Sequence, residues 1–262
     1  MSPILKRMRD TKAGGSTNQA LARGLRVLRV LVEAGEPMTA TQIAHQFGLH
    51  QSSISRILST LTEGGYVRKT SKGKFAPGFG LLSLASATTG QFPLINRPRK
   101  ALETLSRMCV DHTVSLGMLW NGQMTYFLRT SQHASTIDFW ASDFPIHLSA
   151  PGLRLLLDLP REEAVAVLRH SRAQRGWHGV PDVVPPTEEG VLDWAAEHLA
   201  HDALVLRGWH QAHETGAAIP IDTPQGYQVA LAITGKDRDD VDEATLRLWL
   251  HDGRRLVEAA LR

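Results

Sequence analysis

Twelve histidines occur in the chain, and two pairs of them have a spacing that suits a metal ion. His198 and His201 lie three residues apart, as do His210 and His213, so a helix would carry both imidazoles of a pair on one face. A zinc site needs three or four convergent ligands. No HExxH sequence, cysteine pair, P-loop or nucleophile elbow accompanies these histidines. We therefore expect no metal, no cofactor and no catalytic residue, and keep a histidine-based metalloenzyme as a minor alternative.

The segment HQSSISR, residues 50–56, carries a second group of chemically suited side chains. Apart from Ile54, each of its side chains can donate or accept a hydrogen bond. B-DNA's major groove accepts one α-helix and presents base edges to such groups. Gln51 suits adenine and Arg56 suits guanine or a phosphate, while the short hydroxyl groups suit either partner. The hydroxyl residues are Ser52, Ser53 and Ser55. The alternative is that Ser52 and Ser53 only cap a helix and that Arg56 is a solvated surface charge.

Two short helices and a turn are expected to position this segment. Thr39 is a suitable N-cap for a helix over residues 40–47, and Gly48-Leu49 follows as a turn. A second helix is expected from residue 50 to Gly64-Gly65, with an apolar face at spacings of three and four. Two such helices joined by a short glycine-bearing turn are typical of a helix-turn-helix.

A basic hairpin is predicted directly after these helices, over residues 66–78, with its turn at Ser71–Lys74. Arg68, Lys72 and Lys74 in this segment suit the neutralisation of phosphates, and an exposed basic edge without that role is the alternative. The hairpin completes a winged helix-turn-helix, for which we expect residues 18–78.

A third helix is predicted before this motif, from Asn18 to the stop signal Gly35-Glu36-Pro37. Its apolar residues recur at spacings of four, three and four, so we expect them to form its buried face. They are Leu21, Leu25, Leu28 and Val32. Arg23 lies off that face and is a further candidate for contact with DNA.

Charge is divided unevenly along the chain. Residues 1–78 hold twelve Lys/Arg and four Asp/Glu, a net charge of +8, whereas residues 79–262 have a net charge of −5. This asymmetry favours a polyanionic partner for the first part. Residues 1–17 are predicted to be a flexible basic arm. A winged helix that binds a protein, as in an interaction adaptor, is the alternative function, but it would not need this cationic excess.

The rest of the chain is expected to form a linker helix over residues 79–92 and an α/β domain over residues 93–262. Asn121-Gly122 and residues 223–226 are turn signals between pairs of strands. Helices are predicted over residues 94–110, 151–159, 160–170, 187–200 and 240–261. The predicted fold class is α+β, with the winged helix-turn-helix followed by the α/β domain.

Several stretches, in this order, resemble the isocitrate lyase regulator (IclR) family of bacterial transcription factors. They are ARGLRVLRVL, TQIAHQFGLHQSSISRILSTLTEGGYV, PIHLSAPGLRLLL and AIPIDTPQGYQVALAITG. The resemblance implies a dimer or tetramer that binds double-stranded DNA at a pseudo-palindromic operator. It also implies a GAF-like C-terminal domain that binds a small effector, often an organic acid, and a linker helix that helps dimerise the DNA-binding domains.

By this resemblance, the effector site can be placed on a few residues. Ser149 and the Ala150 N–H would receive a carboxylate at a helix N-terminus, although Pro151 removes one donor there. Ala232 and Thr234 stand where many relatives carry serine. Trp209, His210 and His213 lie in a segment that departs from the family pattern, and they favour an aromatic or other organic acid.

Two further features bound the class of protein. The single cysteine, Cys109, cannot form an intramolecular disulfide and is expected to fill the core. No run of 18 apolar residues and no secretory signal is present, so we expect a cytoplasmic protein without membrane contact.

Overall fold

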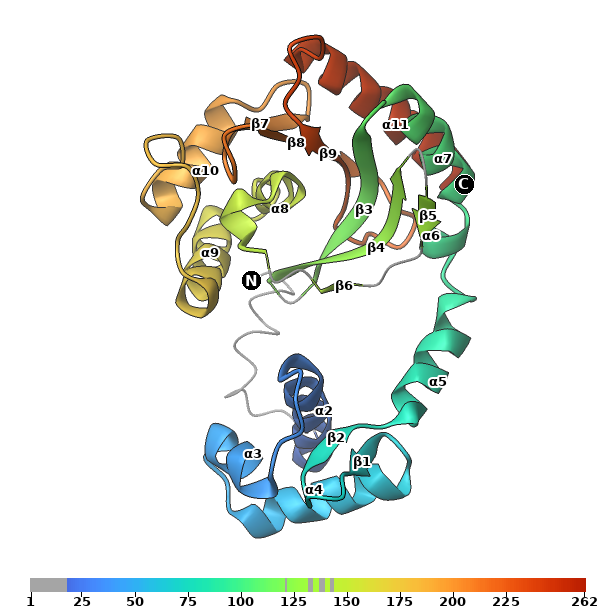
Figure 1. The fold of residues 1–262 in the computed structure, drawn as a ribbon, viewed down its shortest axis with the longest axis vertical. Helices are drawn as coiled ribbons and strands as arrows, with labels where there is room; N and C mark the ends of the chain where they lie inside the picture. Colours follow the sequence, from blue (N-terminus) through green and yellow to red (C-terminus); the bar gives the residue numbers. More distant parts are fainter. Residues whose placement is uncertain (1–17, 121, 132–133, 137–139, 142–143) are drawn as a thin grey trace. The chain divides into compact units, whose positions relative to one another are not determined.

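The computed structural model describes residues 18–120, 122–131, 134–136, 140–141 and 144–262. Within them, backbone contacts define two compact units, residues 18–92 and residues 93–262. Figure 1 shows the first unit as helices with a small hairpin and the second as a sheet flanked by helices.

Three helices build the core of the first unit: α2 (Gln19–Glu33), α3 (Ala40–Phe47) and α4 (Gln51–Glu63). The side chains of Thr39 and Gln42 cap α3 reciprocally, and Gly48 takes the left-handed conformation (φ 59°) that ends it. These local signals place α3 and α4 where the sequence predicted them. Their inward faces pack with α2 around a shared core of Val27, Leu31, Ile43, Ile54 and Leu58.

The predicted buried face of α2 is wrong for three of its four residues, since only Leu28 packs, partly buried, against the core. Val27 and Leu31 are buried, whereas Leu21, Leu25 and Val32 are 62%, 60% and 55% exposed. The helix carries two apolar stripes, and its contacts with α4 and the hairpin are made by the Val27 stripe. Apolar spacing identified the helix but did not show which stripe faces the core.

The hairpin comprises β1 (Val67–Lys69) and β2 (Phe75–Pro77), paired antiparallel with Arg68 opposite Ala76. Helix α5 (Phe79–Thr89) follows it within the same unit. At Gly78 the backbone between the hairpin and α5 approaches the backbone of Gly65 closely. Only glycine fits there, because a Cβ would lie 2.3 Å from the carbonyl oxygen of Gly65.

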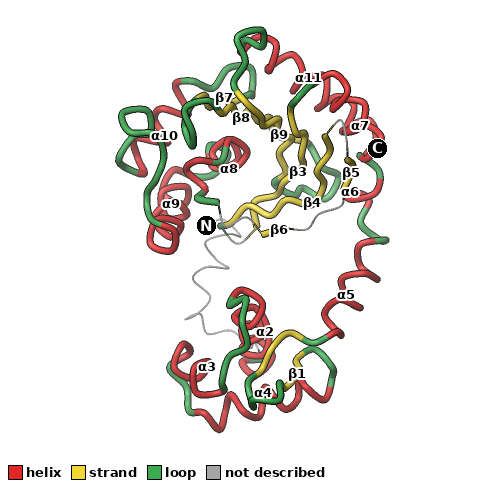
Figure 2. The backbone as a smooth tube through the Cα atoms, viewed as in Figure 1, coloured by secondary structure: helices red, strands yellow, loops and turns green. Residues whose placement is uncertain are grey.

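An antiparallel sheet forms the centre of the second unit, in the strand order β5-β4-β3-β9-β8-β7, with β6 also paired to β4 (Figure 2). The central pairing of β3 with β9 joins segments that are more than 100 residues apart in the chain. The strands are β3 (His112–Trp120), β4 (Gln123–Ser131), β5 (Ala134–Thr136), β6 (Trp140–Ala141), β7 (Leu204–Arg207), β8 (Glu214–Ile221) and β9 (Val229–Lys236).

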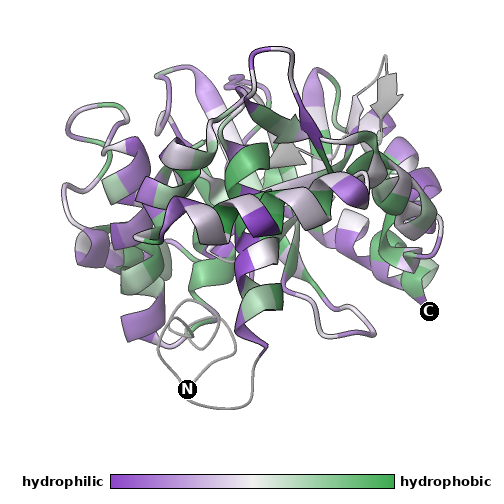
Figure 3. Ribbon diagram, turned by 90° about the horizontal axis from the view of Figure 1, so that it is seen from below, coloured by the Kyte–Doolittle hydropathy of each residue, from purple (hydrophilic) through white to green (hydrophobic). Residues whose placement is uncertain are grey.

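Helices cover both faces of this sheet (Figure 1). One face packs against α7 (Arg99–Met108) and α11 (Glu243–Leu261), and the other against α8 (Ala150–Leu156). Behind α8 lie α9 (Arg161–Arg175) and α10 (Glu188–Glu197). Figure 3 shows hydrophilic and hydrophobic residues on different sides of the helices, as expected when one side covers a core. None of the described helices is long and apolar enough to cross a membrane.

Two predictions about this unit need correction. The single helix expected over residues 94–110 is two helices, α6 (Pro93–Asn96) and α7, because Pro98 cannot continue a helix. The short strand β7 and the 3-10 turn Ile146–Leu148 before α8 were not predicted.

Candidate functional site

The N-terminal half of α4 presents polar side chains to solvent. Gln51, Ser52, Ser55 and Arg56 are exposed and Ser53 is half-buried, whereas Ile54 is fully buried. His50 is the N-cap of α4, and no side chain caps the first turn. The alternative role of the serines as helix caps is therefore not what this structure shows, and their hydroxyl groups face outward with Arg56.

Several cations of α4 and of the hairpin lack acidic partners within the described ranges. Arg56, Arg68, Lys72 and Lys74 form no ion pair with any carboxylate in the part of the chain that the structure describes. By contrast, most arginines of α8–α11 pair with a carboxylate. An excess of unpaired cations beside exposed hydrogen-bonding groups suits a polyanion.

Arg23 takes a different position from these cations. It lies on α2, partly buried, and its guanidinium donates a hydrogen bond to the Gln19 side chain at 3.3 Å. One helical turn further, the Arg26 guanidinium lies 4.9 Å from the ring centroid of Phe47 and so helps pack α2 on α3.

A cavity of about 510 Å³ lies in the second unit, between α8 and one face of the sheet. This volume falls in the range of small-molecule sites. Aromatic walls are supplied by Tyr126, Phe144 and Trp209. The remaining lining residues are Asp111, Thr113, Arg129, Leu148, Ser149, Ala150, Pro151, Leu206, His210, Glu214, Thr215, Gly216, Thr234, Gly235 and Lys236.

Strand register explains how the cavity is composed. Alternate residues of β9 face α8, and they become more polar along the strand, from Ala230 and Ala232 through Thr234 to Lys236. Gly216 of β8 pairs with Thr234, and Glu214 pairs with Lys236. The cavity is therefore apolar at its inner end and polar at its outer end.

A hydroxyl pair lies where α8 begins. The Tyr126 hydroxyl and Ser149 Oγ are 3.2 Å apart, and Ser149 Oγ accepts a hydrogen bond from the Gly152 N–H at 3.1 Å. Burial raises the pKa of Tyr126, while the bond to Ser149 opposes that shift. Tyr126 therefore remains a neutral phenol that can donate or accept a hydrogen bond.

Charged and titratable groups gather at the outer end of the cavity, and two acids there have side-chain partners. Asp111 accepts a hydrogen bond from Arg238 at 2.6 Å, and Glu214 contacts His210 at 2.8 Å. The His210 ring also packs edge-on against Phe144, with 4.9 Å between ring centroids. Lys236 forms no ion pair with a carboxylate of the described residues.

Five of the seven predicted effector-site residues line this cavity: Ser149, Ala150, Trp209, His210 and Thr234. The other two do not. Ala232 is fully buried in the core beneath the cavity, and His213 is exposed on the surface. Their predicted contact with an effector thus has no support from the geometry.

Other lining residues were missed by the sequence analysis. Tyr126 and Lys236 were not singled out, although Lys236 continues the alternation of Ala232 and Thr234 along β9. Tyr126 and Phe144 had no signal in the sequence, because the fold alone brings them to α8.

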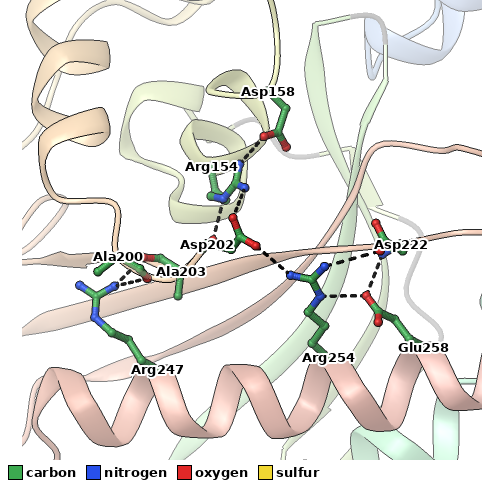
Figure 4. A network of polar contacts seen from close by, with 9 residues as sticks. All are labelled: Arg154, Asp158, Ala200, Asp202, Ala203, Asp222, Arg247, Arg254 and Glu258. Atoms are coloured by element: carbon green, nitrogen blue, oxygen red, sulfur yellow. Dashed lines mark hydrogen bonds and ion pairs between the residues drawn. The ribbon is translucent and has the colours of Figure 1, made fainter.

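An ion network holds α8 against the rest of the unit (Figure 4). The guanidinium of Arg154, on α8, is buried; it donates to the backbone oxygen of Asp202 and to the Asp158 carboxylate, each at 2.7 Å. Asp202 also accepts from Arg254 of α11 at 3.2 Å, and Arg254 bonds Glu258 at 2.9 Å. The helix that lines the cavity is thereby tied to α11.

One histidine of each predicted pair is engaged in another contact. His198 stacks on Trp194 with 3.9 Å between ring centroids, and His210 pairs with Glu214. Among the described residues, no three His, Cys, Asp or Glu side chains converge as metal ligands would.

Fold and sites together define a class: a protein with a winged helix-turn-helix unit and an α/β unit that holds a ligand-sized cavity. Residues 20–71 match the family model described as the IclR helix-turn-helix domain. The chain is 28% identical over 162 residues to the HTH-type transcriptional regulator Rv1719 of Mycobacterium tuberculosis, covering 61% of each chain. It is 25% identical over 160 residues to the transcriptional repressor IclR of Escherichia coli, covering 57% of this chain and 56% of the repressor. The matched region thus spans about three-fifths of these relatives' length.

Solved structures share the fold over nearly the whole chain. An IclR family transcriptional regulator from Brucella abortus has a TM-score of 0.76 at 21% identity, with 96% of this chain and 97% of that chain covered. An IclR homolog from Microbacterium hydrocarbonoxydans, complexed with 4-hydroxybenzoate, has a TM-score of 0.66 at 23% identity, with 93% and 99% covered. Residues 20–71 thus match the IclR helix-turn-helix domain, and the chain shares its fold with these solved structures.

Proposed function

We propose that this protein is a DNA-binding transcriptional regulator whose affinity for its operator is controlled by a small organic acid. The observation that carries the proposal is the exposed polar half of α4, in a unit whose hairpin carries cations without acidic partners among the described residues. A helix of this kind can enter the major groove, with Gln51 and Arg56 directed at bases. Hydroxyl groups of Ser52, Ser53 and Ser55 and the cations of Arg68, Lys72 and Lys74 contact bases or phosphates. In this role the protein has no catalytic residue and acts in the cytoplasm.

Arg56→Ala tests the proposal in a gel-shift titration with DNA from upstream of the protein's own gene. We expect operator affinity to fall by about 1–3 kcal/mol and base preference to relax, because a base contact is lost. Lys72→Ala should weaken binding to all sequences about equally and should lower the dependence of affinity on salt.

Arg107→Ala is the matched control, because Arg107 is an exposed arginine on α7, outside the DNA-binding unit. It should bind DNA as the unaltered protein does. Salt-independent affinity, or no affinity for any duplex, would refute DNA binding and favour the protein-interaction adaptor.

The cavity between α8 and the sheet is the proposed effector site. Its aromatic walls and hydroxyl pair suit an aromatic ring with polar substituents. The structural relative complexed with 4-hydroxybenzoate supports an aromatic acid as the ligand class. In our proposal Ser149, Ala150, Trp209, His210 and Thr234 contact the effector, and His213 and Ala232 do not.

Self-association completes the proposed function. Leu21, Leu25 and Val32 of α2 and Phe79, Leu82 and Leu84 of α5 are large apolar side chains that the described residues leave exposed. Exposed apolar side chains in such number mark an interaction site when they form a patch. We propose that a second copy of the chain covers it, so that two recognition helices meet the two halves of a pseudo-palindromic operator, as a dimer or within a tetramer.

A further inference from the structure

We propose that Lys236 is the residue that selects a carboxylate in the effector cavity, so that the ligand binds with its ring towards Trp209 and its charge towards the outer end of β9. This inference rests on the proposed effector site and adds to it the charge and the orientation of the ligand.

The first step is that the N-terminus of α8 has few hydrogen-bond donors available for a ligand. Ser149 Oγ accepts the Gly152 N–H at 3.1 Å, and the Leu153 N–H bonds the Ser149 carbonyl oxygen at 2.8 Å. Pro151 has no N–H. A carboxylate at this end of the cavity would therefore find little of the hydrogen bonding that a longer, uninterrupted helix start provides.

The second step is the gradient of polarity along the cavity. Side chains facing α8 change from Ala232 to Thr234 to Lys236 along β9, and the ring of Trp209 is buried with Leu206 at the apolar part. A ligand with one apolar and one charged end lowers its free energy by following this gradient, because burial of its charge in the apolar end would cost desolvation.

The third step is the state of the charged groups at the outer end. Asp111 is bonded by Arg238 and Glu214 by His210, so both acids already have partners. Lys236 lies opposite Glu214 in the strand pairing, yet its ammonium forms no ion pair with a carboxylate of the described residues. Arg129 of β4 adds a second cation to the lining. Lys236 thus has capacity for an anionic ligand.

Isothermal titration calorimetry on the full-length protein without DNA tests the inference. The probes are benzoate and 4-hydroxybenzoate, each compared with its uncharged amide of nearly the same shape. We expect both acids to bind about tenfold more tightly than their amides. A gain in affinity of this size lies between that of a surface ion pair and that of a charge-assisted hydrogen bond in a partly desolvated site. Lys236→Met should remove this preference, and Lys236→Arg should retain it.

Lys100→Met is the control, because Lys100 is an exposed lysine on α7 that does not line the cavity. It should keep the preference for acids. Equal affinity of acid and amide for the unaltered protein, an unchanged preference in Lys236→Met, or no binding of any of the four probes would overturn the inference. Because gel shifts without effector measure DNA binding separately, these results are distinguishable from failure of the proposed regulator function.

Discussion

His147 is a buried imidazole with one ring nitrogen left without a partner. It precedes α8 in the 3-10 turn, stacks on Trp177 with 4.0 Å between ring centroids, and its Nε2 lies 2.9 Å from the backbone oxygen of His178. Nδ1 is buried and has no hydrogen-bond partner among the described residues. If Nε2 carries the proton and donates it to His178, then a second proton on Nδ1 would have no acceptor.

Burial accordingly lowers the pKa of His147 from its ordinary value of 6.5, with Arg172 acting in the same direction and Glu188 opposing it. Because the unfolded chain binds the proton more readily, the neutral imidazole contributes stability that is present above pH 6.5 and is lost as the pH falls below it. We expect the free energy of unfolding, measured in urea, to fall between pH 7 and pH 5 by no more than about 1.4 kcal/mol per pH unit from this group.

His147→Gln should flatten this part of the pH profile, whatever its effect on stability at pH 7. His170→Gln is the matched control, because His170 is exposed on α9, and it should leave the slope unchanged. An equal slope in His147→Gln and the unaltered protein would contradict the assignment.

At the scale of elements, α8 is the wall of the cavity and its position depends on Arg154. The guanidinium bonds a turn in which two non-glycine residues, His201 and Asp202, have left-handed backbone conformations (φ 49° and 64°). Such conformations cost energy and persist where neighbouring groups hold them. Arg247 of α11 bonds the backbone oxygens of Ala200 and Ala203 at the same turn.

Arg154→Met should therefore lower the free energy of unfolding by about 1–3 kcal/mol, because buried, charge-assisted hydrogen bonds are lost. Asp158 and Asp202 are about half exposed, so neither would be left as a buried charge. Arg161→Met is the control: its 2.7 Å pair with Asp193 is exposed on both sides and should be worth less than about 1 kcal/mol. Equal urea stability of the two variants would show that the network does not hold α8.

Elements of the first unit were predictable because their signals are local. Thr39, Gly48 and Gly64 mark the ends of α3 and α4 through backbone chemistry within a few residues.

The cavity was predictable only in part, since Ser149 and Thr234 came from the family resemblance. Lys236 was missed because the stretch used for the prediction ended at Gly235, one residue before the end of β9, although the alternation of Ala232 and Thr234 extends to it.

At the scale of the whole molecule, α5 is the helix whose exposure supports the proposed self-association. It has eleven residues, mostly apolar or small, and none of them is buried by the described residues. An isolated helix of this length is marginal in water. Packing against a second copy would supply the burial that α5 lacks, as it would for the outer stripe of α2.

Leu82→Glu tests this packing, since Leu82 is 65% exposed and contributes little to the fold of its own chain. We expect the unaltered protein to sediment as a dimer or larger and Leu82→Glu to sediment as a monomer at micromolar concentration. Operator affinity should then fall by about 10²–10⁴-fold, because the second recognition helix no longer benefits from tethering to the first. Ser83→Glu places the same charge on the neighbouring exposed position and should remain associated and bind DNA. Sedimentation of the unaltered protein as a monomer, or dimeric Leu82→Glu, would show that α5 has another partner.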